Sequence, residues 1–415
     1  MKSVGLITEY NPFHNGHLFH LQQSLEVSEA EVSVAVMSGH FLQRGEPALL
    51  DKWLRSEMAL RAGVDLVVEL PLPWACNSAP EFARGGVQAL SILGVDSLCF
   101  GSESGDLTRL QQCAGLLETY ADRIDHETRD RLRQGENYPT ARAAVVAELS
   151  DDPALTELLA QPNNILGLEY LRALNCQSST ITPFTITRQG AGYHSTEAAD
   201  NIASATGIRT MLGDDEDVAP FVPATTATLL RQGIEGGMNV DSDILYRLLI
   251  QMLQQGGKRL AGIYQIGDGV ENRLYKAAQT AEHIEGLIGL CKSKQFTRTR
   301  IQRILTYILL GIDGGLMKEF LDCGPLYLHL LGQSEKGEAF LAEQRKEFDI
   351  PLVGNYSRVR SILTHRYGRG SQRLRLAQEM LAWEIRATRT YTLLRKNWPG
   401  GNRNLDFFRE VIRTG

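Results

Sequence analysis

The chain has 415 residues, of which 43% are hydrophobic, and its formal net charge is -6. This length exceeds what one hydrophobic core normally serves, so we expect two domains rather than one. We expect neither an exported nor a membrane protein, because no signal-peptide pattern and no stretch of about 18 apolar residues occurs. The six cysteines lack metal-site spacing and are typical of a reduced, cytoplasmic environment.

Short β-branched segments alternate with helical spacing over the first hundred residues. They are SVGLITE from Ser3, EVSVAVM from Glu31, VDLVVEL from Val64 and VDSLCFG from Val95. Strands that alternate with helices predict βαβ units and a parallel sheet, in which ligands bind beyond the carboxyl ends of the strands. We therefore predict an α/β fold with a Rossmann-like parallel sheet.

The later part of the chain has a different pattern. Residues from 105 to about 160 are typical of short polar helices, which we interpret as an insertion. A helix then begins near Asn163 or Asn164, either of which could cap it, and the strand ITPFTITR follows. Helical spacing predominates from about residue 220, with a short extended piece at FDIPLVG. The sequence thus predicts an α/β domain at 1–215 and a mainly α-helical C-terminal domain at 216–415.

Two histidines follow the first predicted strand, in the segment TEYNPFHNGH. His14 and His17 are three residues apart, so they should face the same bound group from the first helical turn. A helix N-terminus attracts anions through its free N–H groups and partial positive charge, and Gly16 should let a ligand approach the backbone. This HxGH pattern predicts a triphosphate site.

A second element, NIASATGIRTML, could also contact phosphate. Ser204 and Thr206 offer hydroxyls and Arg209 offers a guanidinium at another strand-to-helix junction. Alone, the segment is better interpreted as an ordinary capped helix, but beside HNGH a phosphate contact is favoured. The candidate catalytic residues are therefore His14, His17, Ser204 and Arg209.

The loop after the second strand, MSGHFLQRGEPAL, should lie at the same edge of the sheet. His40 could hold the substrate or pack beneath the loop, and we favour the first. No residues show the spacing of metal ligands, so no metal site is predicted. The substrate-loop candidates are Ser38, Gly39, His40, Gln43 and Arg44.

The charges are distributed unevenly along the chain. Residues 251–415 contain 26 Lys and Arg against 16 Asp and Glu, although the whole chain is acidic. This asymmetry is typical of a C-terminal part that contacts a polyanion, and on charge alone it is equally typical of Arg-rich helices with a solvated surface. Three aromatic residues, Phe296, Tyr356 and Tyr367, could stack on nucleic-acid bases or pack in the core. The candidate RNA contacts are Lys292, Lys294, Arg298, Arg300 and Arg303.

Six motifs, taken in order, make this chain resemble a known family. They are TEYNPFHNGH, VMSGHFLQRGEPAL, FGSESGD, PNNILGLEYLRAL, RQGAGYH and IASATGIR, and the match continues into GVENRLYKAA and KSKQFTRTRIQRIL. Over nearly its whole length the chain resembles the bacterial tRNA(Met) cytidine acetate ligase family. It departs from the family pattern ISSTxIR at Ala203 and Ala205, which replace hydroxyl-bearing residues.

The resemblance implies an activity and its ligands. Family members activate acetate with ATP as acetyl-adenylate, releasing pyrophosphate, and transfer the acetyl group to the exocyclic amine of the wobble cytidine of elongator tRNA(Met), which forms 4-acetylcytidine. It implies a catalytic HxGH nucleotidyltransferase-like domain at 1–215 and a tRNA-binding domain at 216–415. We expect ATP with Mg²⁺, and no zinc, flavin or nicotinamide. The ATP-binding residues that it implies are Ile7, Thr8, Glu9, Tyr10, Asn11, Pro12, Phe13, His14, Asn15, Gly16, His17, Leu18, Phe19, His20, Gly101, Asn163, Asn164 and Arg188.

Two other functions stay open at this point. The first is an HxGH adenylyltransferase that makes a dinucleotide-like cofactor, although such enzymes are usually compact single domains. The second is an RNA-binding protein that senses ATP without turning it over. Pyrophosphate release on addition of acetate would separate both from a ligase.

Overall fold

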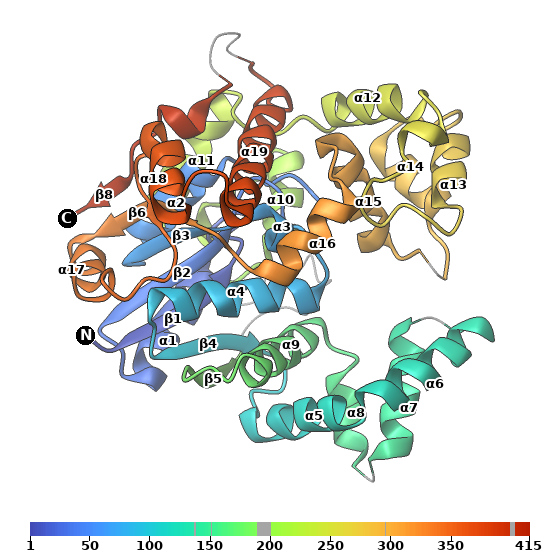
Figure 1. The fold of residues 1–415 in the computed structure, drawn as a ribbon, viewed down its shortest axis with the longest axis horizontal. Coiled ribbons are helices and arrows are strands. Elements are labelled where there is room, and N and C mark those ends of the chain that lie inside the picture. The colour runs from blue at the N-terminus through green and yellow to red at the C-terminus, as the bar shows by residue number, and fades with distance from the viewer. Residues whose placement is uncertain (137, 151, 189–200, 295, 399–402) are drawn as a thin grey trace.

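The structure is a computed structural model of the chain, and it describes residues 1–136, 138–150, 152–188, 201–294, 296–398 and 403–415. One sheet lies at its centre, with helices on both faces (Figure 1). Its eight strands are β1 (Ser3–Thr8), β2 (Val32–Ser38), β3 (Leu66–Leu70), β4 (Ser97–Ser102), β5 (Thr182–Thr187), β6 (Leu328–Ser334), β7 (Leu352–Val353) and β8 (Ile412–Thr414).

The strands lie in the order β5-β4-β1-β2-β3-β6-β7, and β8 pairs with β6 beside β7. Strands β1 to β5 run parallel to one another, whereas β6 runs antiparallel to β3. All seven residues of β2 are buried, and its five apolar residues divide between two hydrophobic clusters, one on each face of the sheet. This double burial explains why the early strands read as continuous apolar runs.

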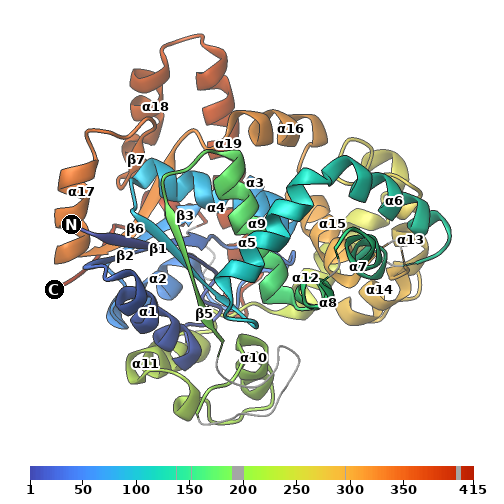
Figure 2. The same cartoon turned by 90° about the horizontal axis from the view of Figure 1, so that it is seen from below.

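Helices cover both faces of this sheet (Figure 2). One face packs against α3 (Leu72–Ala75), α4 (Ala79–Leu93), α9 (Pro162–Cys176) and α17 (Glu335–Gln344). The other packs against α1 (Asn15–Ser28), α2 (Lys52–Arg61), α10 (Ala205–Gly213) and α11 (Ala224–Glu235). The carboxyl ends of β1, β2 and β4 therefore lead directly into the loops that carry the candidate site.

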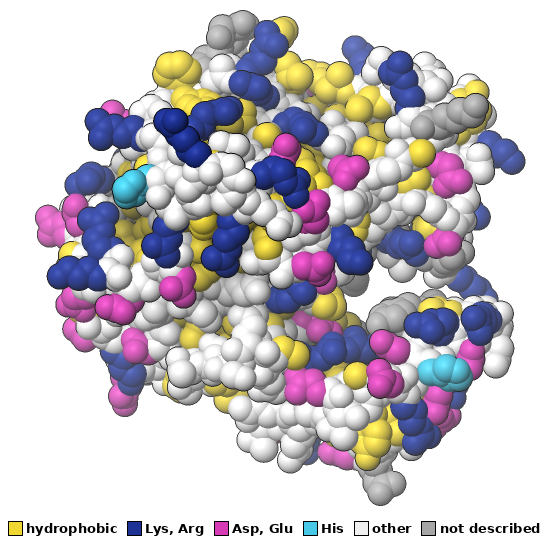
Figure 3. Space-filling view, in the orientation of Figure 1, with side chains coloured by type: hydrophobic (Ala, Val, Ile, Leu, Met, Phe, Trp, Pro, Cys, Tyr) yellow, Lys and Arg dark blue, Asp and Glu magenta, His cyan; other side chains and the backbone are white. Residues whose placement is uncertain are grey.

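Two groups of helices project from this central layer. The first lies between β4 and α9 and comprises α5 (Leu107–Thr119), α6 (Ala121–Arg133), α7 (Tyr138–Leu149) and α8 (Pro153–Leu158). The second comprises α12 (Ser242–Leu253), α13 (Val270–Ala277), α14 (Ile284–Cys291) and α15 (Arg298–Leu310). The surface is hollowed between the two groups (Figure 3), and Lys294 crosses from the second group to donate to the carbonyl of Gly135 at 2.7 Å.

The remaining elements return the chain to the sheet. They are α16 (Gly314–Cys323), α18 (Val359–Tyr367), α19 (Gln372–Leu393) and the short 3-10 helices η1 (Ala219–Phe221), η2 (Gly257–Arg259), η3 (Tyr356–Arg358) and η4 (Leu405–Phe407). Within the described part of the chain, no helix has the length and apolar character needed to cross a membrane.

The predicted fold class, a parallel sheet with helices followed by a mainly helical region, is confirmed. The sequence did not indicate β6 or β8, whereas β7 lies in the extended piece expected at FDIPLVG. The sheet therefore takes strands from both sides of the boundary expected at residue 215.

Candidate active site

The loop from β1 to α1 presents two imidazoles at a helix N-terminus. His14 is the N-cap residue, and its Nδ1 accepts a hydrogen bond from the backbone N–H of Gly16 at 3.0 Å. His17, three residues later, accepts at Nδ1 from the backbone N–H of His14 at 3.3 Å. The two rings stack with centroids 3.8 Å apart. They thus form a capping box in which two imidazoles replace the usual hydroxyl and carboxylate.

This arrangement fixes where each imidazole carries its proton. A neutral imidazole has one N–H, and in both His14 and His17 the Nδ1 atom accepts a hydrogen bond, so the proton lies on Nε2. Each ring therefore presents an Nε2–H donor. A Cβ on Gly16 would lie 2.9 Å from Cε1 of His14, so this glycine makes room for the ring itself and not only for a ligand.

Burial keeps these imidazoles neutral in the absence of an anion. Burial, together with the smaller effect of the guanidiniums of Arg188 and Arg209, lowers the pKa of His14 to about 3. Burial also lowers the pKa of His17 well below its ordinary value, with His14 and Arg188 adding to the effect. The pKa of His20, one turn further along α1, is lowered to about 4 by burial and by Arg188. Neutral donors next to two arginines suit a bound group that is strongly negative.

The second predicted element meets the first in space. Ser204 caps α10 by accepting from the N–H of Gly207 at 3.0 Å, and Arg209 on the same helix donates to the carbonyl of Asn11 at 2.9 Å. Asn15 donates to the carbonyls of Asn201 and Pro220, each at 3.0 Å. Residues about 190 positions apart in the sequence therefore surround one helix N-terminus.

Arg209 also contacts two side chains in this region. Its Nη2 lies 3.3 Å from Oε1 of Glu46, in the loop after β2, and 3.3 Å from the hydroxyl of Thr206. The guanidinium thus lies between the HNGH loop and the loop after β2, with its charge partly balanced by one carboxylate.

A third group of predicted residues gathers where β4 ends and α9 begins. Arg188 donates from Nη1 to Oδ1 of Asn163 at 3.0 Å. The carboxylate of Glu103 accepts from the backbone N–H groups of Asn163 and Asn164, at 3.1 and 2.7 Å, and so occupies the N-terminus of α9. A Cβ on Gly101 would lie 3.1 Å from Cγ of Arg188, so this glycine leaves space for the arginine chain as well.

Comparisons with known proteins show the family to which the chain belongs. Residues 1–404 match the family model described as HIGH Nucleotidyl Transferase. The chain is 54% identical over 409 residues to the tRNA(Met) cytidine acetate ligase of Syntrophotalea carbinolica, with 98% of both chains covered. It is 39% identical, with full coverage of both chains, to the protein of that name in Caldanaerobacter subterraneus. The chain belongs to the tRNA(Met) cytidine acetate ligase family.

Solved structures of a family member extend the similarity to three dimensions. The Thermotoga maritima TmcAL bound with alpha-thio ATP has a TM-score of 0.91 and 31% identity, with both chains fully covered. The apo form of the same protein gives a TM-score of 0.93. The resemblance inferred from the six motifs is thus confirmed over the whole chain, although only Arg188 of RQGAGYH lies within the described residues.

Several members of the predicted ATP-binding stretch have buried side chains. Tyr10 and Phe13 are 1% and 0% exposed, and their rings pack around His17 with centroids 5.0 and 5.6 Å from its own. Asn11 accepts from the N–H of Leu49 at 2.7 Å, which holds the loop against the segment after β2. These residues shape the loop and orient the imidazoles.

The loop after β2 shows which of the two alternatives for His40 fits the fold. His40 is 3% exposed and packs beneath the loop, with its ring centroid 4.5 Å from that of Tyr391 and 5.4 Å from that of Trp53. The arrangement favours packing over substrate contact. In the same loop, the backbone N–H of Gln43 donates to Glu9 at 2.7 Å, and burial raises the pKa of that carboxyl.

Arg55 joins the two loops and was not predicted from the sequence. It is fully buried, and its guanidinium donates to the carbonyls of Glu9, Ser38 and Gly39, which lie at the ends of β1 and β2. It also donates to the carbonyl of Leu50 at 3.0 Å. No local sequence pattern indicates this role, because an arginine in a predicted helix is normally interpreted as a surface residue.

The predicted RNA-binding residues divide into two groups. Lys292, Lys294 and Arg298 are exposed. Arg300 is half-buried over the ring of Phe296, and Arg303 is half-buried against the carbonyl of Gln43. Phe296 and Tyr356 are each 2% exposed, so for these two aromatic residues the core-packing alternative is correct, while Tyr367 is half-buried and donates to the carbonyl of Leu326 at 2.5 Å.

Proposed function

We propose that this chain is an ATP-dependent ligase that acetylates the exocyclic amine of the wobble cytidine of elongator tRNA(Met). The observation that carries the proposal is the pair of Nε2–H imidazoles at the N-terminus of α1, with Arg188 and Arg209 within electrostatic reach. The curated relatives with the printed name tRNA(Met) cytidine acetate ligase support the choice of substrate. A tRNA substrate is consistent with a cytoplasmic location.

In the first step, an oxygen of acetate attacks the α-phosphorus of ATP, and the bond to the bridging oxygen of pyrophosphate breaks. Negative charge then builds on the departing pyrophosphate. We propose that His14, His17 and Arg209 stabilise that charge, because donors that already point at it lower the activation barrier without rearrangement. Ser204 and Thr206 supply supporting hydrogen bonds. The products of this step are acetyl-adenylate and pyrophosphate.

In the second step, the exocyclic nitrogen of cytidine attacks the acetyl carbonyl carbon, AMP leaves with its electron pair, and the nitrogen loses one proton. The acyl donor is already activated, so positioning of the cytidine supplies much of the rate. We propose that the exposed cations Lys292, Lys294 and Arg298 help to hold the tRNA. Arg188, Asn163 and Gly101 are proposed to contact the nucleotide at the other side of the site.

Mg²⁺ is proposed to accompany ATP. Among the described residues, no group of three or more His, Cys, Asp or Glu is placed to hold a metal ion. The donor set therefore fits an ion held mainly by phosphate oxygens and water, which is the common arrangement for Mg²⁺ with nucleotides. Its contribution would be to neutralise phosphate charge.

The decisive experiment supplies [14C]acetate and bulk tRNA to the protein, with and without ATP, and analyses the labelled nucleosides. We expect ATP-dependent label in 4-acetylcytidine. Consumption of ATP only when a phosphorylated metabolite is supplied would contradict the proposal and favour an adenylyltransferase, whereas ATP binding without any turnover would favour a sensor.

The assignment of the imidazoles is tested separately with His17→Asn. This change removes the Nε2–H donor that we assign to the phosphates. We expect acetate-dependent exchange between ATP and pyrophosphate to fall by about two orders of magnitude, which is the typical effect of removing one preorganised donor. Exchange at the wild-type rate would show that His17 does not stabilise the transition state.

A further inference from the structure

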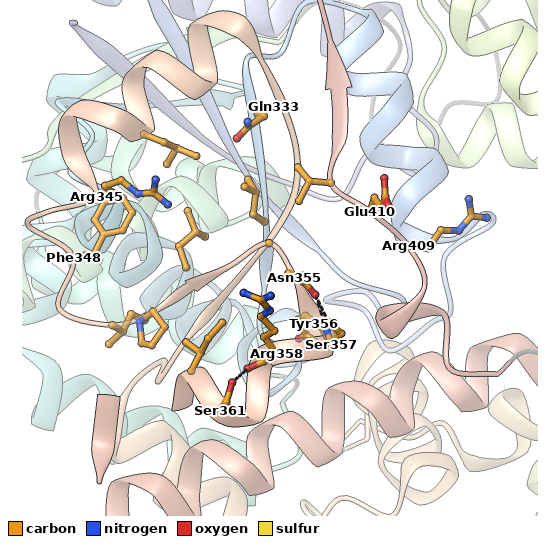
Figure 4. A pocket seen from close by; sticks show the side chains of 18 of the residues that line it. Gln333, Arg345, Phe348, Asn355, Tyr356, Ser357, Arg358, Ser361, Arg409 and Glu410 are labelled. Atoms are coloured by element: carbon orange, nitrogen blue, oxygen red, sulfur yellow. Dashed lines mark hydrogen bonds between the residues drawn. The ribbon is translucent and has the colours of Figure 1, made fainter. Parts of the chain in front are cut away.

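A large groove opens on the outer edge of the sheet, away from the HNGH loop. It has a volume of about 1410 Å³ and lies between β6, α17, α18 and the segment before β8 (Figure 4). Strand β6 pairs with β7 only through Leu328 and His329, and with β8 only through residues 332–334. Leu330 therefore lies in the gap and lines the groove. Pockets for small molecules rarely exceed about 1,000 Å³, so the size suits a polymer.

The groove carries an excess of positive charge. Five arginines and one histidine line it, against two glutamates. Among the described residues, Arg413 pairs with Glu338 at 3.2 Å, whereas Arg345, Arg358 and Arg409 have no carboxylate partner. Figure 3 shows Lys and Arg side chains around apolar side chains on this face. Cations left without internal counter-charge attract an external polyanion. The charged lining residues are Arg345, Arg358, His365, Arg366, Arg409 and Arg413, with Glu338 and Glu410.

Apolar and aromatic side chains form the floor between these cations. Leu330, Leu352 and Val411 line it, and Phe348 lies beside Arg345 (Figure 4). Phe408 also lines the groove and is 67% exposed, the highest value for any large hydrophobic residue described. Guanidiniums for phosphates, together with aromatic faces for bases, are the combination that single-stranded nucleic acids require.

The wall of this groove is connected to the candidate active site. Asp406, just before Phe408, pairs with the buried Lys52 at 2.7 Å, at the start of α2. The guanidinium of Arg409 lies 5.9 Å from the ring centroid of Trp53, also on α2. The same helix carries Arg55, which holds the loops after β1 and β2. One helix thus fixes the groove relative to the site of reaction.

We propose that this groove binds an unpaired segment of the tRNA, distinct from the nucleotide that reacts. The identity of the RNA as tRNA rests on the proposed function, whereas the evidence for a binding site is the charge and shape of the groove. The phosphates of the RNA segment would lie along Arg345, Arg358 and Arg409, and its bases would stack on Phe348 and Phe408.

The test compares the affinity of tRNA for the wild type and for R345Q/R358Q over a range of salt concentrations. Loss of two phosphate contacts should weaken binding by roughly tenfold to thirtyfold at physiological salt and reduce the slope of log affinity against log salt by about two. The matched control is R129Q/R231Q, which removes two exposed arginines that have no carboxylate partner among the described residues. An unchanged salt slope in R345Q/R358Q, or an equal loss in the control, would overturn the inference.

A second measurement does not depend on charge removal. A photoreactive phenylalanine analogue, p-benzoylphenylalanine, placed at Phe408 should form a crosslink to tRNA on irradiation, and single-stranded RNA should compete with it. Crosslinks only to a second copy of the chain, or no RNA adduct, would refute the groove as an RNA site. Because 4-acetylcytidine formation by the wild type is measured independently, failure of the proposed function and failure of the groove can be told apart.

Discussion

The imidazoles at the start of α1 should make folding stability depend on pH. His14 is 4% exposed, and burial, aided by Arg188 and Arg209, lowers its pKa to about 3. In the unfolded chain a histidine titrates near pH 6.5. Between these two values the unfolded state binds more protons than the folded state, so stability is complete above about pH 6.5 and falls as the pH is lowered.

The size of the effect follows from the same two values. Each proton bound only by the unfolded state changes the free energy of unfolding by about 1.36 kcal/mol per pH unit. His14 alone should therefore reduce stability by about 2 kcal/mol between pH 7 and pH 5. His17 and His20 have lowered pKa values for the same main reason, so the wild type should lose more than this amount.

The His14→Asn variant isolates this contribution. Asparagine retains a side-chain acceptor for the helix cap but does not titrate. Urea unfolding at pH 7 and pH 5 gives the free energy of unfolding at each pH. We expect the difference between the two free energies to be about 2 kcal/mol smaller in the variant than in the wild type. His283→Asn is the control, because His283 caps α14 through Nδ1 at 3.1 Å but is exposed. An undiminished pH difference in His14→Asn would refute the reasoning.

Three further substitutions, one of them with a matched control, test the residues that support the site. A Cβ on Gly39 would collide with Glu69, so Gly39→Ala should lower the free energy of unfolding by about 1–3 kcal/mol. The control is Gly115→Ala in α5, where a Cβ would meet no atom within 4 Å, and this change should raise the free energy of unfolding by about 0.5–1 kcal/mol. Urea titrations measure both values. Arg55→Lys keeps the charge but leaves buried carbonyls unpaired, and should cost about 3 kcal/mol in the same assay. Glu103→Gln should lower ATP affinity about tenfold by loosening the start of α9, as measured by calorimetry; unchanged affinity would exclude that role.

Local sequence patterns were sufficient to predict two helix starts at the candidate active site. The HNGH motif predicted a helix start, and α1 begins at Asn15 with His14 as its cap. IASATGIR predicted a second capped helix, and Ser204 caps α10. In both cases the signal and the structure lie within a few residues of each other, so short-range preferences decide the conformation.

Long-range partners could not be predicted in this way. Strand β6 pairs with β3 across about 260 residues, and its apolar run has no period that separates a strand from a buried helix. Arg55 and Glu103 bind backbone groups of distant segments, and nothing near them in the sequence marks those partners. The burial of Phe296 likewise depends on tertiary packing and not on the basic residues around it.

The ion pair between Lys52 and Asp406 connects residues 354 positions apart, and both side chains are fully buried. During synthesis on the ribosome, α2 emerges long before Asp406, the second carboxylate partner of Lys52. Until then Lys52 can pair only with Glu69. Until Asp406 is in place, Lys52 has one carboxylate partner instead of two, and a buried ionic group that has lost one of its partners is destabilised. The sheet and the loops of the candidate active site should therefore become fully rigid only after nearly the whole chain has been made, so the reaction with ATP would begin only when the proposed RNA-binding groove also exists.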